Sequence, residues 1–149
     1  MAPYFETWFF DKYQFLLCIY HAVVVSFNEK SIEWPCLPPE VDSVATSPVV
    51  RAFITAMQQF LAQCEADLTH LATEVSVEEF FNAAPTFVGP DFTFADFTAI
   101  FALAVKMAEQ NPESAIEICE FAYQLALEHM WAHFARLGGW YAFVEEFGP

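Results

Sequence analysis

The feature that most restricts the fold is the stretch of residues 133–148, which holds three of the four glycines of the chain. Glycine adopts positive φ angles without steric cost, so the Gly138-Gly139 pair predicts a sharp break between two helices. After the break, large apolar side chains recur at steps of three and four residues: Trp140, Phe143, Val144 and Phe147. This spacing places them on one face of a short helix. Because a short helix is unstable alone in water, we expect that face to dock on a larger body.

The composition indicates one compact domain that spans residues 1–149. Hydrophobic residues make up 56% of the chain, and its 18 phenylalanines exclude an intrinsically disordered protein. The formal net charge is −15, whereas nucleic acids and anionic lipids bind basic surfaces. We therefore expect no nucleic acid partner and no attraction to anionic lipid. The acidic residues either attract basic or amphipathic partners or keep a very apolar chain in solution.

The apolar patterns predict an all-α fold. A long first helix is expected over residues 4–27, which are apolar on most sides of a helix. A loop is expected over 28–47, where three prolines fall among polar residues. Ser47 and Pro48 are typical of a helix start, and we expect the helix that follows to run to about Thr73.

Three further helices are expected before the glycine break. Ser76 and Glu79 have the spacing of a capping box at the start of a short helix. A helix from about Thr93 to Gln110 is apolar almost all round, which is typical of a central helix enclosed by others. The next helix is expected to begin near Pro112 and to continue towards the two glycines.

No arrangement of residues indicates catalysis, so we expect neither an enzyme nor a cofactor or metal. His129 and His133 are four residues apart, but the residues between them lack the glutamate of a His-Glu-x-x-His motif. No apolar run is long enough to span a bilayer, and no apolar tail follows Gly148, so we expect no membrane anchor in this sequence. The cysteines are far apart and in no metal-like spacing, which indicates reduced thiols in a cytoplasmic protein: Cys18, Cys36, Cys64 and Cys119.

Residues 127–148 resemble the second homology motif of the Bcl-2 family. In that motif a Gly-Gly-Trp turn, here Gly138, Gly139 and Trp140, precedes a short helix of the form aromatic-Val-Glu-x-aromatic-Gly, here residues 143–148. The order of long helix, loop, long helix, short helix, apolar helix, long helix, break and short helix is also similar to that family. The resemblance implies a Bcl-2-like helical bundle with a buried central helix and a hydrophobic surface groove.

Bcl-2 proteins bind an amphipathic BH3 helix in this groove, through apolar anchors at helical spacing. The resemblance implies that the groove wall of this chain comes from its second helix, the short helix with the turn after it, the central helix and the last helix. Some of these side chains could instead be ordinary core, and the pattern does not separate the two. The matching positions are Phe53, Met57, Phe60, Leu61, Cys64, Leu68, Phe80, Phe81, Phe87, Phe94, Ala95, Asp96, Thr98, Ala99, Leu103, Phe143 and Phe147.

The resemblance fails at the arginine with which the family pairs the aspartate of a BH3 ligand. The family motif Asn-Trp-Gly-Arg matches residues 93–96, so that Asp96 stands at the arginine position with the opposite charge. A register shifted by two residues places Phe94 there instead. We therefore expect the protein to bind BH3 helices by apolar contacts alone, to bind few of them, or to use Arg51 or Arg136 in a rearranged way.

The second helix lacks the Gly-Asp pair of a BH3 motif, which pro-apoptotic members of the family need. This favours an inhibitor of apoptosis that is similar to compact viral members and sequesters BH3 helices of pro-apoptotic proteins. We expect such a protein in the cytoplasm or at the mitochondrial outer membrane. Two alternatives stay open: a membrane-permeabilising pro-apoptotic effector, and an unrelated all-α protein whose phenylalanines close a homodimer.

Overall fold

The computed structural model describes the backbone of residues 2–33 and 47–148, and the side chains of residues 12–33 and 47–148. Cys36 and the three prolines of the expected loop lie outside the described residues. The first helix is slightly longer than the pattern predicts, because it begins at residue 2 and ends at residue 29.

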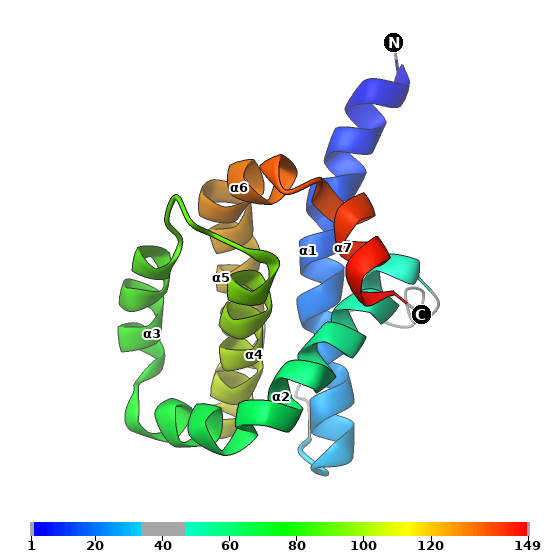
Figure 1. The fold of residues 1–149 in the computed structure, drawn as a ribbon. Helices are drawn as coiled ribbons and strands as arrows, with labels where there is room; N and C mark the ends of the chain where they lie inside the picture. The colour runs from blue at the N-terminus through cyan, green and yellow to red at the C-terminus, as the bar shows by residue number, and fades with distance from the viewer. Residues whose placement is uncertain (1, 34–46, 149) are drawn as a thin grey trace.

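The described chain is helical and contains no β-strand, which confirms the all-α class (Figure 1). Short turns of 3-10 helix, η2 and η3, and one π-helical segment, η4, join or extend the α-helices. In chain order the elements are α1 (Ala2–Glu29), α2 (Pro48–Glu74), α3 (Val77–Ala83), η2 (Ala84–Phe87), α4 (Phe94–Gln110), η3 (Pro112–Ser114), α5 (Ala115–Leu125), η4 (Ala126–Met130), α6 (Trp131–Arg136) and α7 (Gly139–Phe147).

Helix α4 lies at the centre of the bundle, in contact with α1, α2 and α5 (Figure 1). Phe97 of α4 is completely buried. The centroid of its ring lies 5.6 Å from that of Phe15 in α1, 5.4 Å from that of Phe134 in α6 and 5.8 Å from that of Trp140 in α7. Burying one such side chain stabilises the fold by about 1.5–3 kcal/mol, so this aromatic cluster is a main link between the ends of the chain.

Local capping chemistry fixes where two helices begin, as the sequence predicts. In the first turn of α3, Ser76 Oγ accepts a hydrogen bond from Glu79 N at 3.0 Å, and Ser76 N donates to Glu79 Oε1 at 3.1 Å. At the start of α4, Thr93 Oγ1 accepts from Asp96 N at 3.2 Å, and Thr93 N donates to Asp96 Oδ2 at 3.0 Å. These paired bonds satisfy backbone donors that the helix itself leaves free.

The predicted break before the last helix is confirmed. Gly138 has φ 111° and Gly139 has φ 65°, both in the left-handed region that side chains disfavour. The chain turns there between α6 and α7, and Trp140 docks into the core with only 6% of its surface exposed. The apolar face of α7 therefore closes the bundle.

Two helices differ from the pattern. Helix α2 ends at residue 74, close to the expected end at Thr73, but it is kinked at Cys64, which has φ −146° and ψ 24°. The helix expected from Pro112 to the glycines begins with the 3-10 turn η3 and is interrupted by the π-helical segment η4. No Gly or Pro lies at the kink or in η4, so neither interruption has a mark in the sequence.

Candidate helix-binding groove

Two hollows lie side by side along α2 and α4. The first has a volume of about 310 Å³ and is lined by Leu68, Leu71, Phe87, Asp96, Ala99, Ile100 and Leu103. The second has a volume of about 200 Å³ and is lined by Ala56, Gln59, Phe60, Gln63, Ala95, Thr98 and Phe147. Consecutive residues in the first turn of α4 belong to the two linings: Ala95 lines one hollow and Asp96 lines the other. We call the two hollows together the groove.

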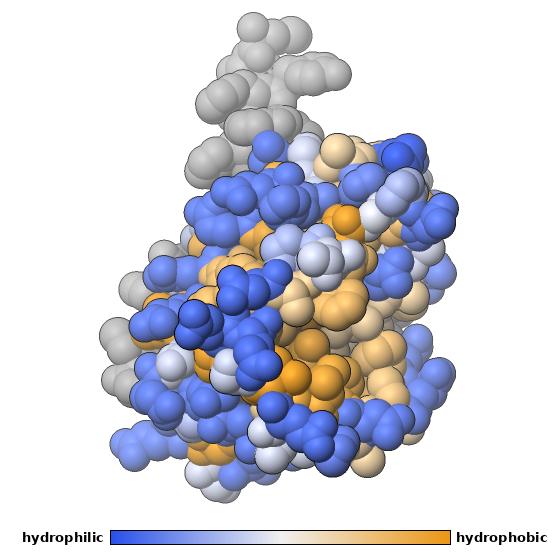
Figure 2. Space-filling model, turned by 90° about the vertical axis from the view of Figure 1, so that its left-hand side faces the viewer, coloured by the Kyte–Doolittle hydropathy of each residue, from blue (hydrophilic) through white to orange (hydrophobic). Residues whose placement is uncertain are grey.

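Apolar side chains dominate the walls of the groove, and some are unusually exposed. The exposed fractions of Leu71 and Phe87 are 41% and 62%. Tyr141, with 78%, is the other large apolar side chain this exposed in the described part of the chain, and it lies outside both hollows. Figure 2 shows that apolar side chains gather in the middle of the face on which α3 lies, with hydrophilic ones around them. Exposed apolar surface of this kind is typical of a docking site.

About half of the positions that the family resemblance assigns to the groove do line it. On the larger hollow these are Leu68, Phe87, Asp96, Ala99 and Leu103, and on the smaller one Phe60, Ala95, Thr98 and Phe147. The pattern did not assign Leu71 and Ile100 to the groove. Leu71 lies three residues beyond Leu68 and continues the apolar stripe of α2. That spacing could have been used to assign Leu71 to the groove.

Most of the other assigned positions belong to the core. Phe53, Met57, Phe80, Phe94 and Phe143 are buried, so a ligand could reach them only if the helices moved. Leu61 lines a different cavity next to α1, and Cys64 Sγ donates to the carbonyl of Phe60 at the kink. The ring of Phe81 stacks on that of Phe121, with the ring centroids 4.3 Å apart.

The groove holds one charged residue, and that residue is acidic. The half-buried Asp96 lines the larger hollow while its Oδ2 accepts the capping bond from Thr93 N. Within the described residues, no Lys or Arg lines either hollow. Arg51 is exposed in the first turn of α2, and Arg136 donates to the carbonyl of Pro90 at 3.0 Å. Neither arginine therefore lines the groove.

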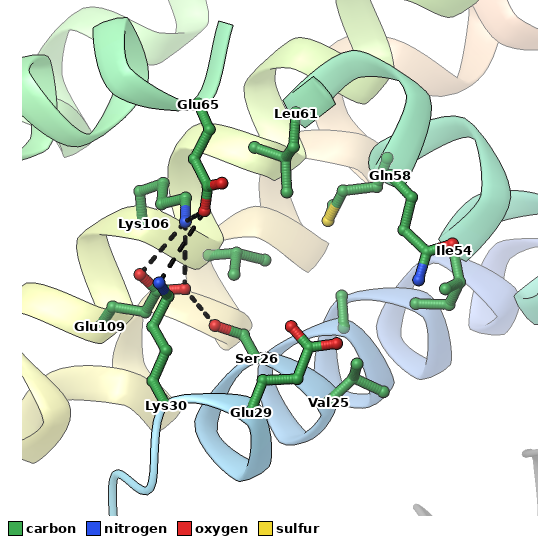
Figure 3. A pocket seen from close by; sticks show the side chains of 13 residues that line it. Val25, Ser26, Glu29, Lys30, Ile54, Gln58, Leu61, Glu65, Lys106 and Glu109 are labelled. Atoms are coloured by element: carbon green, nitrogen blue, oxygen red, sulfur yellow. Dashed lines mark hydrogen bonds and ion pairs between the residues drawn. The ribbon is translucent and has the colours of Figure 1, made fainter. Parts of the chain in front are cut away.

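A cluster of charges that the sequence did not indicate joins α1, α2 and α4 (Figure 3). Lys106 has only 2% of its side chain exposed, and its Nζ donates to Glu65 Oε2 at 2.6 Å and to Glu109 Oε1 at 3.3 Å. The hydroxyl of Ser26 donates to Glu109 Oε2, and Lys30 Nζ lies 3.8 Å from Glu65 Oε2. The hydrogen bond from Lys106 lowers the pKa of the Glu65 carboxyl below its ordinary value. Every charge in this cluster has a partner, as a structural role requires.

Metal-binding and membrane-spanning features are both missing from the described part of the chain. No group of three or more His, Cys, Asp or Glu side chains there could hold a metal ion. His133 Nδ1 instead lies 3.0 Å from Arg136 Nη2. None of the helices in the described ranges is long and apolar enough to cross a membrane. Burial raises the pKa of the Cys18 and Cys119 thiols, which keeps both protonated and unreactive.

No protein-family model and no curated protein sequence matches this chain. The residues themselves therefore carry any conclusion about function.

Proposed function

We propose that this protein binds amphipathic helices of the BH3 type in the groove and inhibits apoptosis by sequestering them. The observation that carries the proposal is the pair of apolar hollows along α2 and α4, with Phe87 and Leu71 exposed at the larger one. A helix with apolar residues at i, i+3 or i+4, and i+7 presents successive anchors along one side. Two neighbouring hollows on one face suit two successive anchors of this kind.

The Bcl-2-like motif supports the same proposal. Trp140 docks α7 onto the bundle after a left-handed glycine turn, and Phe147 at the end of α7 lines the smaller hollow. In this proposal the motif has a structural purpose: it holds one end of the groove in place. Sequestration would occur where pro-apoptotic helices are found, in the cytoplasm or at the mitochondrial outer membrane.

Titration calorimetry of the full chain with a panel of BH3 peptides tests the proposal. We expect at least one peptide to bind with a dissociation constant below about 1 μM, which corresponds to about −8 kcal/mol. Phe87→Ala should weaken this binding about tenfold, since truncating an anchor contact in a docking site costs more than about 1 kcal/mol. Because Phe87 is 62% exposed, its removal should leave the fold intact.

Tyr141→Ala is the matched control, because Tyr141 is also an exposed aromatic residue but lies outside the groove. The Tyr141→Ala variant should bind the peptides with the same affinity as the wild type. Absence of heat and of competition for every peptide would disprove the proposal.

Self-association is the second candidate, and the exposure of Leu71 and Phe87 is the observation that favours it. A second copy of the chain could cover these side chains in place of a ligand helix. Sedimentation equilibrium separates the two functions. A dimer that Phe87→Ala dissociates, together with no binding of any peptide, would identify the groove as a homodimer interface.

A further inference from the structure

The elements that form the groove expose carboxylates to solvent. Exposed acidic side chains include Asp67 and Glu74 on α2 and Glu145 on α7. The whole chain has a formal net charge of −15. A cationic helix that approaches this face is therefore attracted, and an anionic helix is repelled, before any contact forms.

Asp96 brings this charge into the groove itself. Its side chain is half-buried and lines the same hollow as Leu68, Ala99 and Leu103. One carboxylate oxygen accepts the capping bond from Thr93 N, and a carboxylate has about four acceptor sites in all, so it can accept further bonds from a ligand. A charge beside apolar walls is poorly screened by water, so its sign affects binding more strongly there than on an open surface.

Each of the five basic residues lies outside the linings of both hollows. Lys106 is buried between carboxylates, Lys30 approaches Glu65, and Arg136 donates to a backbone carbonyl. Lys12 lies over the ring of Trp131, and Arg51 is in the first turn of α2. No cation of the protein is thus placed to neutralise an aspartate of a helix bound in the groove.

We propose that the groove selects an amphipathic helix with a Lys or Arg where the helix passes Asp96, and rejects a helix with an Asp there. This inference rests on the proposed function and narrows its partner: a BH3-type helix binds only when its own aspartate is absent or lies away from Asp96. The ligand ammonium or guanidinium donates to the Asp96 carboxylate while the apolar face of the helix fills the two hollows. An aspartate at the same place would bring two carboxylates together beside apolar walls, and both would lose hydration without gaining a partner.

The test uses one amphipathic peptide with an unchanged apolar face. Lys, Ala or Asp is placed in turn at each position that borders this face, and the affinity of the full chain for each peptide is measured by calorimetry at low salt. At one position the Lys peptide should bind about tenfold more tightly than the Ala peptide, and the Asp peptide should bind more weakly than both. Raising the salt concentration should reduce these differences, because salt screens the charges.

Asp96→Asn identifies the protein group responsible. The amide oxygen of Asn can still accept the capping bond from Thr93 N, so this variant removes the charge and keeps the cap. The preference for Lys over Asp should vanish in Asp96→Asn. It should persist in the matched control Asp67→Asn, which removes an exposed charge on α2 outside both linings.

Two results would overturn the inference and leave the proposed function standing. In one, the Asp peptides bind wild-type protein as tightly as the Lys peptides at every position. In the other, the preference for Lys survives in Asp96→Asn. If no peptide binds, whatever its charge, both the inference and the proposed function are wrong.

Discussion

Lys106→Met should be among the most destabilising single substitutions in this protein. The substitution replaces a buried cation by an apolar side chain of similar length. It leaves the carboxylate of Glu109, whose side chain is only 6% exposed, with the hydroxyl of Ser26 as its donor. Removing one partner of a buried ion pair typically costs about 3–5 kcal/mol, because the remaining charge is left without compensation.

The two carboxylates of the cluster should contribute unequally to this cost. Glu65 has 49% of its side chain exposed, so after the loss of Lys106 it can return to water. Exposed pairs of this kind contribute about 0–1 kcal/mol, and Glu65→Gln alone should therefore cost little. Most of the cost of Lys106→Met should come from Glu109. The double variant Lys106→Met with Glu109→Gln should therefore recover at least about 2 kcal/mol, since buried ion pairs can be replaced by neutral groups at little cost.

Urea unfolding followed by circular dichroism measures these free energies, with the wild type and Glu65→Gln as references. We expect Lys106→Met to be the least stable of the four proteins, and the double variant to lie between it and the wild type. A cost below about 1 kcal/mol for Lys106→Met would mean that water reaches the cluster. A double variant less stable than Lys106→Met would show that the Glu109 charge is not the cause.

Two further predictions concern the glycine turn and a half-buried histidine. Gly138→Ala should cost at least about 2 kcal/mol, because φ is 111° and the new Cβ would lie 2.6 Å from Cβ of Ala142. Gly139→Ala should cost only about 1 kcal/mol, since nothing lies within 4 Å of the position of the new Cβ. Thermal unfolding tests both, and equal losses of melting temperature in the two variants would contradict this prediction. Burial lowers the pKa of His21 below its ordinary value of 6.5, so the unfolded chain takes up the proton first and stability falls as the pH drops through 6.5 towards the folded pKa. His21→Leu should therefore gain stability relative to the wild type as the pH is lowered, and a stability difference independent of pH would refute this.

Local chemistry explains why helix ends were predictable. The capping boxes at Ser76 and Thr93 depend on side chains three residues apart, and the turn at Gly138 depends on glycine alone. The kink at Cys64 was not predictable, because no Gly or Pro stands there and the stripe of apolar residues continues through it.

The division between core and groove was predictable only in part, for a related reason. Phe53, Met57 and Phe60 follow one another on α2 at steps of four and three, and their side chains are equally suited to burial. The first two are buried, whereas Phe60 lies at the smaller hollow together with Phe147. The side chain that stays accessible is therefore determined by how far α4 and α7 cover α2, and a single helical stripe does not contain that information.

The buried cation depends on even more distant partners. Lys106 lies 41 residues from Glu65 in the chain, and Ser26 lies 83 residues from Glu109, so no local pattern brings these groups together. A lysine at the end of an apolar helix usually extends its charge into water. Here it is buried, and only one alignment of α2 with α4 keeps it paired with Glu65. Sliding α2 by one helical turn, about 5.4 Å, would separate the two charges. Lys106 would keep Glu109, which is on its own helix, so the pair with Glu65 adds only about 0–1 kcal/mol in favour of this register. The same register brings Leu68 and Leu71 of α2 opposite the groove side of α4.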